Sequence, residues 1–333
     1  MLFVASVVIA CGRDETAKAP QPAQSQQTQL LPGQAPPVRR VELAIPAKFD
    51  EAGIFAEGLA PVRVGGKFGY ADIKGDIAIM PQFDFATRFS EGLAGAGVGA
   101  KIGYVDKSGN FAIVPQFGVA DLAPFSEGLA AVRIGEFIAG KWGYIDKKGS
   151  VVIQPQYDAA GPFSDGLAVA AIGNKFGYID KSGMVVIPMQ YASAGSFSDG
   201  LAAVRMGDVV NGKTGYIDKT GKVVIAPQFD GAYSFADGLA AVRVGNKYGF
   251  IDKNGKLVIP ARFDFADSFS GALAAFRQGS ETDAKYGYLD RMGNVAIDPQ
   301  FDFADLFSKE AGLAAVREGD EKTGKWGYVA APK

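Results

Sequence analysis

The chain has 333 residues with 34 Lys plus Arg, 36 Asp plus Glu and a net charge of −2, so its charge gives no basis for binding nucleic acid. Histidine is absent and Cys11 is the only cysteine, which excludes His-dependent catalytic triads, His–zinc sites and intramolecular disulfides. We therefore expect no metal and no cofactor, and a fold stabilised by a packed core.

The N-terminal residues 1–11 have the pattern of a lipoprotein signal segment. Leu2 to Ala10 is an apolar run that is too short to span a bilayer but long enough for a signal-peptide core. Its end, VIAC, resembles a bacterial lipobox with Cys11 at the acylated position, although no Lys or Arg precedes the run. We predict lipidation at Cys11 and a place in the bacterial cell envelope, periplasmic or at the cell surface. A chance apolar N-terminus is the alternative.

Residues 12–40 are predicted to form a disordered linker. They are rich in Gln, Pro and Ala and have few large apolar residues, so burial cannot offset the entropy of ordering them. A flexible chain of this length reaches about 30 Å, which suits a tether between an anchor and a folded domain.

Residues 41–333 are organised as a tandem repeat. A glycine followed by Tyr or Phe recurs at intervals of 34 to 40 residues, and this periodicity indicates a repeat architecture. The recurring glycines are Gly69, Gly103, Gly143, Gly177, Gly215, Gly249, Gly287 and Gly327.

The copy at 238–260 shows the predicted module. Residues 239–244 and 247–252 alternate like strands and flank Gly245-Asn246, a two-residue hairpin signal. This turn pairs Arg243 with Tyr248 and leaves both faces of the sheet largely apolar. A sheet with two apolar faces needs a neighbour on each side, which stacked modules supply.

A third strand is predicted after the hairpin. Asp252 to Gly255 has the composition of a type I turn, and residues 256–259 follow as a strand. Pro260 cannot donate to a ladder, so it either ends that strand or lies on a sheet edge.

Three motifs in fixed order resemble a known family. They are KWGYIDKKG at 141–149, VVIQPQYD at 151–158 and FSDGLA at 163–168, and together they resemble the bacterial WG-repeat proteins over Val41 to Val329. Two modules keep the tryptophan of the motif, Trp142 and Trp326. The resemblance implies tandem β-repeats of unassigned role in bacterial envelopes and elsewhere.

The order of segments predicts how the array closes. The chain enters the repeat with a third-strand segment at 41–46 and leaves it with a second strand at 325–329. The fold class is therefore all-β, with eight tandem three- to four-stranded repeats closed as a β-propeller-like ring whose N- and C-terminal strands are exchanged. An open β-solenoid is the alternative.

Two recurring residue types look like chemistry but have structural explanations. The aspartates that open each D-x-x-G stretch are expected to form turns rather than a carboxylate array. The arginines that face an aromatic residue across the hairpin are expected to pack as cation–π pairs, with glycan stacking as the alternative. The arginines are Arg63, Arg133, Arg243, Arg277 and Arg317, and the aspartates are Asp106, Asp146, Asp180, Asp218, Asp252 and Asp290.

Half of the hairpins are four residues longer than the others, and two of their tips are apolar. Phe137 and Ile138 lie in GEFIAG, and Val209 and Val210 lie in GDVVNG. We predict these four residues as partner contacts, because exposed apolar groups mark interaction sites. Drift of tolerated loops is the alternative.

The sequence favours a non-enzymatic function. A lipid-anchored, extracytoplasmic module that binds or scaffolds an envelope protein or glycan suits an array of near-identical repeats. The alternatives are a hydrolase that acts on envelope glycans with two carboxylates, and a purely structural envelope protein. Two acids that break the repeat pattern and face each other in one cleft would favour the hydrolase.

Overall fold

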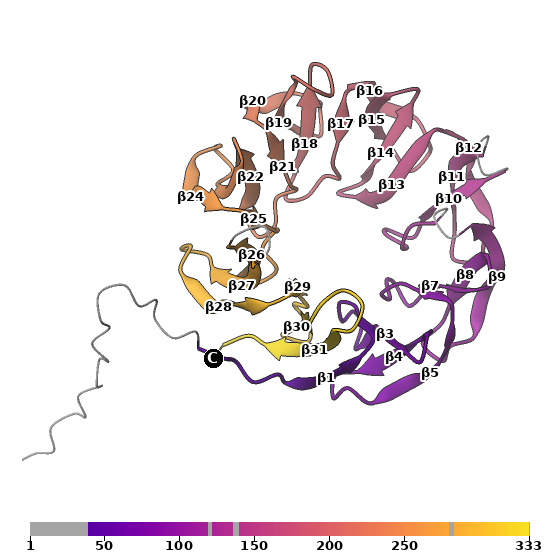
Figure 1. The fold of residues 1–333 in the computed structure, drawn as a ribbon. Helices are drawn as coiled ribbons and strands as arrows, with labels where there is room; N and C mark the ends of the chain where they lie inside the picture. Colours follow the sequence, from indigo (N-terminus) through magenta and orange to yellow (C-terminus); the bar gives the residue numbers. More distant parts are fainter. Residues whose placement is uncertain (1–38, 119–121, 136–139, 280–282, 333) are drawn as a thin grey trace, which may run out of the picture. The chain divides into compact units, whose positions relative to one another are not determined.

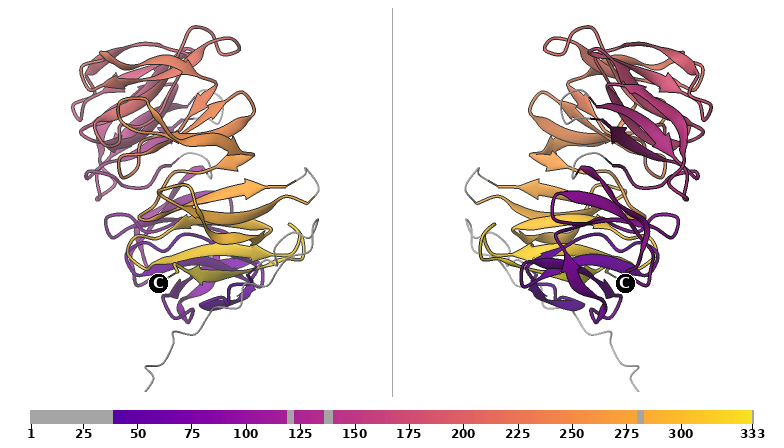
Figure 2. Two further views of the ribbon diagram at one scale, coloured as in Figure 1. Left: turned by 90° about the vertical axis from the view of Figure 1, so that its left-hand side faces the viewer. Right: turned by 90° about the vertical axis from the view of Figure 1, so that its right-hand side faces the viewer.

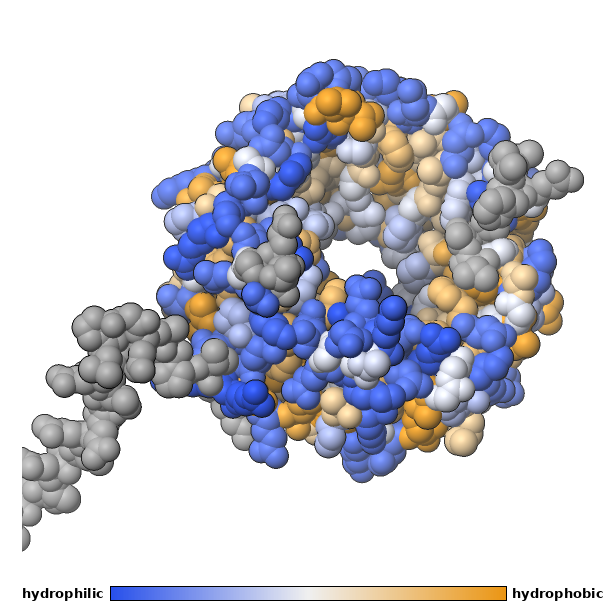
Figure 3. Space-filling view, in the orientation of Figure 1, coloured by the Kyte–Doolittle hydropathy of each residue, from blue (hydrophilic) through white to orange (hydrophobic). Residues whose placement is uncertain are grey.

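The computed structural model describes residues 39–118, 122–135, 140–279 and 283–332, which belong to the compact unit Val38–Lys333. Eight antiparallel sheets stand around a central opening (Figure 1), and the space-filling view shows that side chains leave this opening unfilled (Figure 3). The unit is therefore an eight-bladed β-propeller, as the all-β ring prediction stated. Within the described residues, no helix has the length and apolar character needed to cross a bilayer.

Seven blades run from an inner strand of two to six residues near the opening to an outer edge strand, and blade 3 has three strands in the part of the chain that the structure describes. Blades 1 to 4 contain β2 (Glu51–Ala52), β3 (Leu59–Val64), β4 (Lys67–Asp72) and β5 (Ile77–Phe83); β6 (Phe85–Ala86), β7 (Ala94–Val98), β8 (Lys101–Val105) and β9 (Phe111–Gly118); β10 (Ala130–Ile134), β11 (Lys141–Ile145) and β12 (Val151–Tyr157); and β13 (Ala159–Ser164), β14 (Leu167–Ile172), β15 (Lys175–Ile179) and β16 (Val185–Tyr191).

Blades 5 to 8 repeat this order. They contain β17 (Ser193–Ala194), β18 (Leu201–Met206), β19 (Lys213–Asp218) and β20 (Val223–Phe229); β21 (Gly231–Ala232), β22 (Ala240–Val244), β23 (Lys247–Ile251) and β24 (Leu257–Phe263); β25 (Phe265–Ala266), β26 (Leu273–Gln278), β27 (Lys285–Asp290) and β28 (Val295–Phe301); and β29 (Phe303–Phe307), β30 (Leu313–Glu318) and β31 (Lys325–Ala330), which the N-terminal strand β1 (Ile45–Phe49) completes.

The hairpin register is the one that the sequence predicts. In blade 6, Arg243 pairs with Tyr248 and Val244 with Lys247. The outer strand β24 continues through Pro260 instead of ending there. Proline is tolerated because β24 is an edge strand, and its pairing with β23 is irregular at this point.

The apolar faces of neighbouring blades pack against each other. One face of blade 6, with Ala241 and Phe250, packs on Ala274 and Phe276 of blade 7. The other face, with Ala240 and Val242, packs on blade 5. Every blade thus contributes to two cores, which explains why the predicted sheets are apolar on both faces.

The glycine and the tyrosine of the repeated motif have different structural roles. A Cβ at Gly143 would lie 2.4 Å from the carbonyl oxygen of Ile153, so only glycine lets the outer strand approach. The next residue, Tyr144, is fully buried and its hydroxyl donates to the carbonyl oxygen of Gly161 in the next blade, at 2.8 Å. The motif therefore fixes both the outer strand and the neighbouring blade.

Strand exchange closes the ring, as predicted. The closing sheet has the order β1-β31-β30-β29, with Ile45 opposite Tyr328 and Phe49 opposite Trp326. The strand begins at Ile45 rather than at Val41. Residues before it continue along blade 7, where the amide of Val41 donates to Gln300 Oε1 at 3.0 Å. Both ends of the repeat are thus paired, and the solenoid alternative is wrong.

Candidate functional site

The ring has two faces, which we define by the connections that they carry. The hairpin face carries the β-hairpins that join the second and third strands of a four-stranded blade, such as β3 and β4, counted from the inner strand. It also carries the connections between blades. The turn face carries the inner turns and the D-x-x-G turns. Figure 2 shows the hairpins of the orange and yellow blades projecting to one side of the ring, and Figure 3 looks onto this face.

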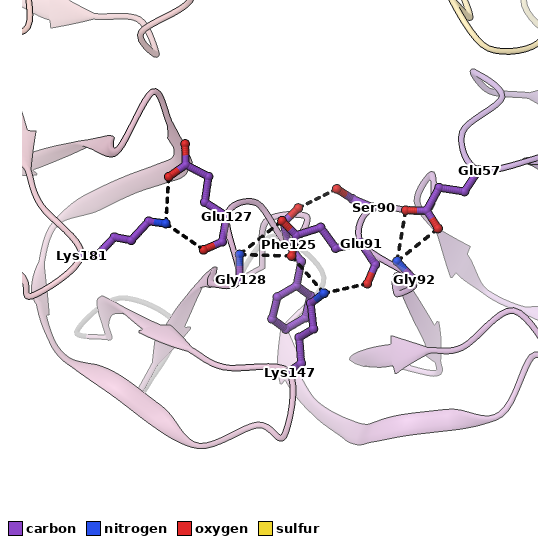
Figure 4. A network of polar contacts seen from close by, with 9 residues as sticks. All are labelled: Glu57, Ser90, Glu91, Gly92, Phe125, Glu127, Gly128, Lys147 and Lys181. Carbon is purple, nitrogen blue, oxygen red and sulfur yellow. Dashed lines mark hydrogen bonds and ion pairs between the residues drawn. The ribbon is translucent and has the colours of Figure 1, made fainter.

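The turn face carries a repeated latch between neighbouring blades, shown in Figure 4. Glu91 accepts a hydrogen bond from the amide of Gly128 and pairs with Lys147, each at 3.1 Å from Oε2. The hydroxyl of Ser90 donates to the carbonyl oxygen of Phe125 at 2.6 Å. All three contacts join one blade to the next, so their role is structural.

The latching acid holds a strained backbone conformation. Its φ lies between 53° and 56° in six blades, a region that costs a residue with a Cβ about 1 kcal/mol or more. Burial tends to raise the pKa of Glu57, but Lys107 and the amide of Gly92 outweigh it and lower that pKa. The six acids are Glu57, Glu91, Glu127, Asp165, Asp199 and Asp237.

The turn face departs from this pattern in blades 7 and 8. Blade 7 has Gly271 at the latch position, and blade 8 has a longer turn from which Lys309 reaches Asp237 of blade 6 at 2.8 Å. A cavity of about 330 Å³ is lined here by residues of blades 1, 2, 7 and 8, including Phe55, Arg88 and Leu306.

The hairpin face is more variable, and its clearest departure is the 207–212 hairpin between β18 and β19. Asp208 accepts the amides of Val210 and Asn211 at 2.8 and 2.6 Å, and the amide of Gly212 returns to the carbonyl of Asp208. The hydrogen bonds from Asn211 and Val210 lower the pKa of the Asp208 carboxyl. Val209 and Val210 are 70% and 82% exposed at the tip of this well-defined turn.

The 319–324 hairpin of blade 8 has the same turn with a different tip. Asp320 accepts the amides of Lys322 and Thr323, both at 2.8 Å, and the amide of Gly324 returns to the carbonyl of Asp320. Its tip carries Glu321 and Lys322 where the 207–212 hairpin carries two valines. The backbone geometry of these hairpins is therefore kept while the chemistry of the tip changes.

A cavity of about 340 Å³ lies beside the 207–212 hairpin, between blades 5 and 6. It is lined by Arg205, Thr214 and Tyr233 among others. Thr214 stands where other blades have a large side chain, and the smaller residue leaves this space. Arg205 connects the cavity to the hairpin, because its guanidinium donates to the carbonyls of Val210 at 3.3 Å and Asp230 at 3.0 Å.

Six aromatic rings, which we name the aromatic row, continue from this cavity over blades 6 to 8. Successive ring centroids lie 6.3, 5.6, 6.2, 5.4 and 5.3 Å apart, within the range of favourable aromatic pairs. Both Tyr233, which also lines the cavity, and Phe303 are 37% exposed. The row consists of Tyr233, Tyr248, Phe265, Tyr286, Phe303 and Trp326.

The predicted arginine–aromatic pairs are cross-strand neighbours. Arg63 lies over Phe68 at 5.6 Å and Arg317 over Trp326 at 5.9 Å, which confirms a cation–π contact for these two pairs. The D-x-x-G aspartates form turns, as expected. In blade 6, for example, Asp252 accepts the amides of Asn254 and Lys256 at 2.9 Å.

Among the described residues, two acids break the repeat in or directly after the inner strands of adjacent blades. Asp267 and Asp305 occupy the same module position in blades 7 and 8, where blades 1 and 4 have Gly53 and Gly161. Burial raises the pKa of both carboxyls, and Asp267 raises that of Asp305 further. Neither lines the two cavities described above. In the part of the chain that the structure describes, no group of three or more metal-ligating side chains occurs.

The structure locates two of the five site residues predicted from sequence. Val209 and Val210 lie together on the exposed 207–212 hairpin. Cys11, Phe137 and Ile138 lie outside the described residues. Sequence reasoning missed the cavity beside Arg205 and the aromatic row. Thr214 in place of a large residue was the available signal for the cavity.

Comparison with known protein families gives one match that covers most of the chain. The family model described as "WG containing repeat" matches eight segments, residues 42–68, 68–101, 102–136, 142–176, 176–209, 215–248, 248–281 and 286–326. No curated protein matches the chain.

Solved structures give weaker likenesses. The crystal structure of Kluyvelomyces marxianus Hsv2 is 10% identical, with a TM-score of 0.45, and the match covers 86% of this chain and 97% of that one. The crystal structure of the tricorn protease is 13% identical, with a TM-score of 0.35 and 81% of this chain covered. The chain spans 38% of the tricorn protease chain. Neither likeness bears on function.

Proposed function

Since this chain belongs to the family of WG-containing-repeat proteins and its repeats close into a β-propeller, we propose that it is a binding or scaffolding protein that receives a protein partner on the hairpin face. Near-identical blades suit a rigid platform better than a catalyst, because catalysis needs particular groups converging at one place.

The 207–212 hairpin is the observation that carries the proposal. Two exposed valines are held on a turn whose Asp208 accepts two backbone amides, so their display costs little further ordering on binding. Arg205 ties this hairpin to the adjacent cavity, which offers a partner a concave surface of mixed polarity. The aromatic row extends that surface with tyrosine and tryptophan rings, residue types enriched in interfaces.

An exchange of hairpin tips tests this proposal. The variant Val209→Glu/Val210→Lys gives the 207–212 hairpin the tip chemistry of residues 321 and 322, and the 319–324 hairpin shows that this turn accepts such a tip. We expect an unchanged melting temperature and a loss of partner affinity of about tenfold or more, measured after the partner is identified by cross-linking in envelope fractions.

The matched control is the reverse change, Glu321→Val/Lys322→Val, which leaves the 207–212 hairpin intact. The proposal requires that this control keeps the wild-type cross-links. A tip-exchange variant that retains every cross-link would show that the valines are tolerated loop residues.

The proposed location is the bacterial cell envelope, with the protein anchored through lipid on Cys11. The VIAC motif supports this, and the polar segment at 12–40 has the composition of a tether. Several acyl chains on one cysteine hold a protein stably, whereas one chain does so marginally. Cys11→Ser is expected to move the protein from the membrane fraction to the soluble fraction. A wild-type protein that is soluble and retains Met1 by mass spectrometry would refute the anchor.

A glycan hydrolase is the second candidate. Asp267 and Asp305 break the repeat at equivalent positions of adjacent blades, but neither lines either of the two cavities described above, so the condition of two acids facing each other in one cleft is not met there. Release of reducing ends from envelope glycans, lost in both Asp267→Asn and Asp305→Asn, would establish this activity. Equal release by the variants would refute it. A purely structural envelope role is the third alternative, and no specific observation favours it over binding.

A further inference from the structure

The cavity between blades 5 and 6 lies where other junctions of the ring hold aromatic side chains. At a junction, the residue before the repeated glycine of one blade corresponds to the first residue of the next blade's inner strand. Between blades 6 and 7 these two residues are Tyr248 and Phe265, whose ring centroids lie 5.6 Å apart. Between blades 5 and 6 they are Thr214 and Gly231, and both line the cavity of about 340 Å³.

This junction differs from the others in having no ring at either position. Seven junctions have both positions among the described residues, and six of them carry at least one aromatic side chain. The six pairs are Phe68 with Phe85, Trp142 with Ala159, Phe176 with Ser193, Tyr248 with Phe265, Tyr286 with Phe303, and Trp326 with Glu51.

The backbone does not require the small residue at Gly231. Its φ lies outside the left-handed region, and a Cβ there would lie 3.6 Å from its nearest neighbour, the Nε of Arg243. That distance is an ordinary van der Waals contact, so a side chain fits. The space between blades 5 and 6 is therefore kept open by the choice of side chains and not by the path of the chain.

Arg205 provides a guanidinium at this space. In blades 1 and 8 the corresponding arginine lies over the ring of its cross-strand partner, at 5.6 Å for Phe68 and 5.9 Å for Trp326. The cross-strand partner of Arg205 is Thr214, which has no ring. The guanidinium is nevertheless fixed, because it donates to the carbonyls of Asp230 and Val210. Its position suits a cation–π contact with a ring that comes from elsewhere.

Tyr233 supplies an aromatic wall to the same cavity. It ends the aromatic row, with its ring centroid 6.3 Å from that of Tyr248, and its side chain is 37% exposed. A ring in the cavity would extend the row by one member. The volume suffices, because an engineered apolar cavity of about 150 Å³ binds benzene.

We infer that this cavity receives an aromatic side chain from a partner polypeptide, which packs against the Arg205 guanidinium and beside Tyr233. The inference rests on the proposed function, because it names the group by which a partner on the hairpin face is held. Six other junctions have such a ring from the chain itself, which favours an aromatic side chain as the occupant. Beyond the described residues, the sequence has two aromatic residues to offer, Phe3 and Phe137.

The experiment measures binding of p-cresol, the side chain of tyrosine, to the full chain by NMR titration and by the rise in melting temperature. The matched ligand is 4-methylcyclohexanol, which has a similar size and no π face. We expect p-cresol to shift the amides of Thr214 and Gly231 and to bind about threefold or more tighter than the matched ligand.

Two sets of variants locate the site. Thr214→Tyr/Gly231→Phe, the filled variant, supplies the pair of rings found between blades 6 and 7, so it is expected to abolish binding and to raise the melting temperature. Arg205→Met is expected to weaken p-cresol binding about threefold to tenfold. Arg63→Met is the matched control, because it makes the same change in blade 1, and it should bind p-cresol like the wild type.

Several outcomes would overturn the inference. Equal binding of 4-methylcyclohexanol would show that a ring is not recognised, and unchanged binding in the filled variant would place the probe elsewhere. Tighter binding of methyl β-glucoside would indicate a glycan. Binding in Phe3→Ala/Phe137→Ala but not in the wild type would mean that the chain supplies its own ring. If the filled variant does not fold, Arg205→Met and Arg63→Met decide.

This inference and the proposed function fail separately. Binding of p-cresol in the cavity, together with unchanged cross-links in the tip-exchange variant, would support the cavity and refute the partner contact of the 207–212 hairpin. Loss of those cross-links without p-cresol binding in the wild type would support the hairpin contact and refute the aromatic site.

Discussion

Tyr144 donates its buried hydroxyl to the carbonyl of Gly161 in the next blade, and six other junctions repeat this contact, whereas the hairpins of the same blades differ in length, charge and apolar character. The contrast separates two demands on the repeat. The interfaces between blades must be alike because each blade is packed by the next in the same way. The hairpins are outside that packing, so their chemistry can serve a partner.

The largest effect should come from the closing strand. Phe49 is 2% exposed in β1, and its ring lies 6.4 Å from that of Tyr328. Phe49→Ala is expected to lower the free energy of unfolding by about 3–5 kcal/mol, because it leaves a cavity in the sheet that joins both ends of the ring. Chemical denaturation measures this, with Val209→Ala as the exposed control. Equal losses in the two variants would contradict the contrast between interfaces and hairpins.

A smaller loss is expected when one contact between blades is removed. Tyr144→Phe deletes the hydroxyl that reaches Gly161 and leaves a partly buried carbonyl without its donor. The expected loss is about 1–2 kcal/mol of unfolding free energy. Tyr286→Phe, in the half-buried aromatic row, is the matched change and should cost less than about 0.5 kcal/mol. Similar losses would mean that the repeated tyrosine contact does not hold the blades together.

A still smaller effect, of opposite sign, is expected for Asp305→Asn. Burial and Asp267 raise the pKa of this carboxyl above its unfolded value. The carboxyl therefore favours the fold most at low pH, and this contribution is lost as pH rises through the folded pKa. Asn should raise the melting temperature at pH 7 and leave it unchanged at pH 3. A fall at pH 7 would show that the ionised form is stabilised by contacts that the asparagine lacks.

The smallest effect is expected from the hairpin face. Deleting Asp208 to Asn211 gives blade 5 a hairpin as short as those of blades 1, 2, 4 and 6. Those blades complete their cores without the extra residues, so the free energy of unfolding should change by no more than about 0.5 kcal/mol. A large loss on calorimetry would place the 207–212 hairpin in the structural part of the repeat.

The parts of the fold that depend on local pattern could be predicted from the sequence. Gly245-Asn246 between two alternating runs specified the hairpin and its register, and D-x-x-G specified the following turn. The number and order of the repeat segments predicted that residues near Ile45 close the ring. The first segment corresponds to an outer strand, and no hairpin of its own module precedes it. These signals lie within a few residues, or in the order of the repeats.

The remaining features depend on contacts between blades, which a single module does not reveal. The inner strands are as short as two residues and carry no alternation that would mark them, as in Ser193–Ala194. In the sequence the latching acids look like ordinary turn residues. Only the structure shows that Glu91 contacts Gly128 and Lys147 of the next blade. Gly118 stands where other copies have an aspartate, such as Asp84. Only the structure shows that this aspartate joins Lys67 of one blade to the amide of Gly99 in the next blade.

The central claim is that the departures on the hairpin face contact the partner, and site-specific photo-cross-linking tests it most directly. A photoreactive residue is placed at position 210 in one variant and at position 322 in another, on hairpins with the same Asp-held turn. The account predicts a discrete adduct from position 210 in intact envelopes and none of that mass from position 322. Adducts that are equal from both positions, or absent from both, would contradict it.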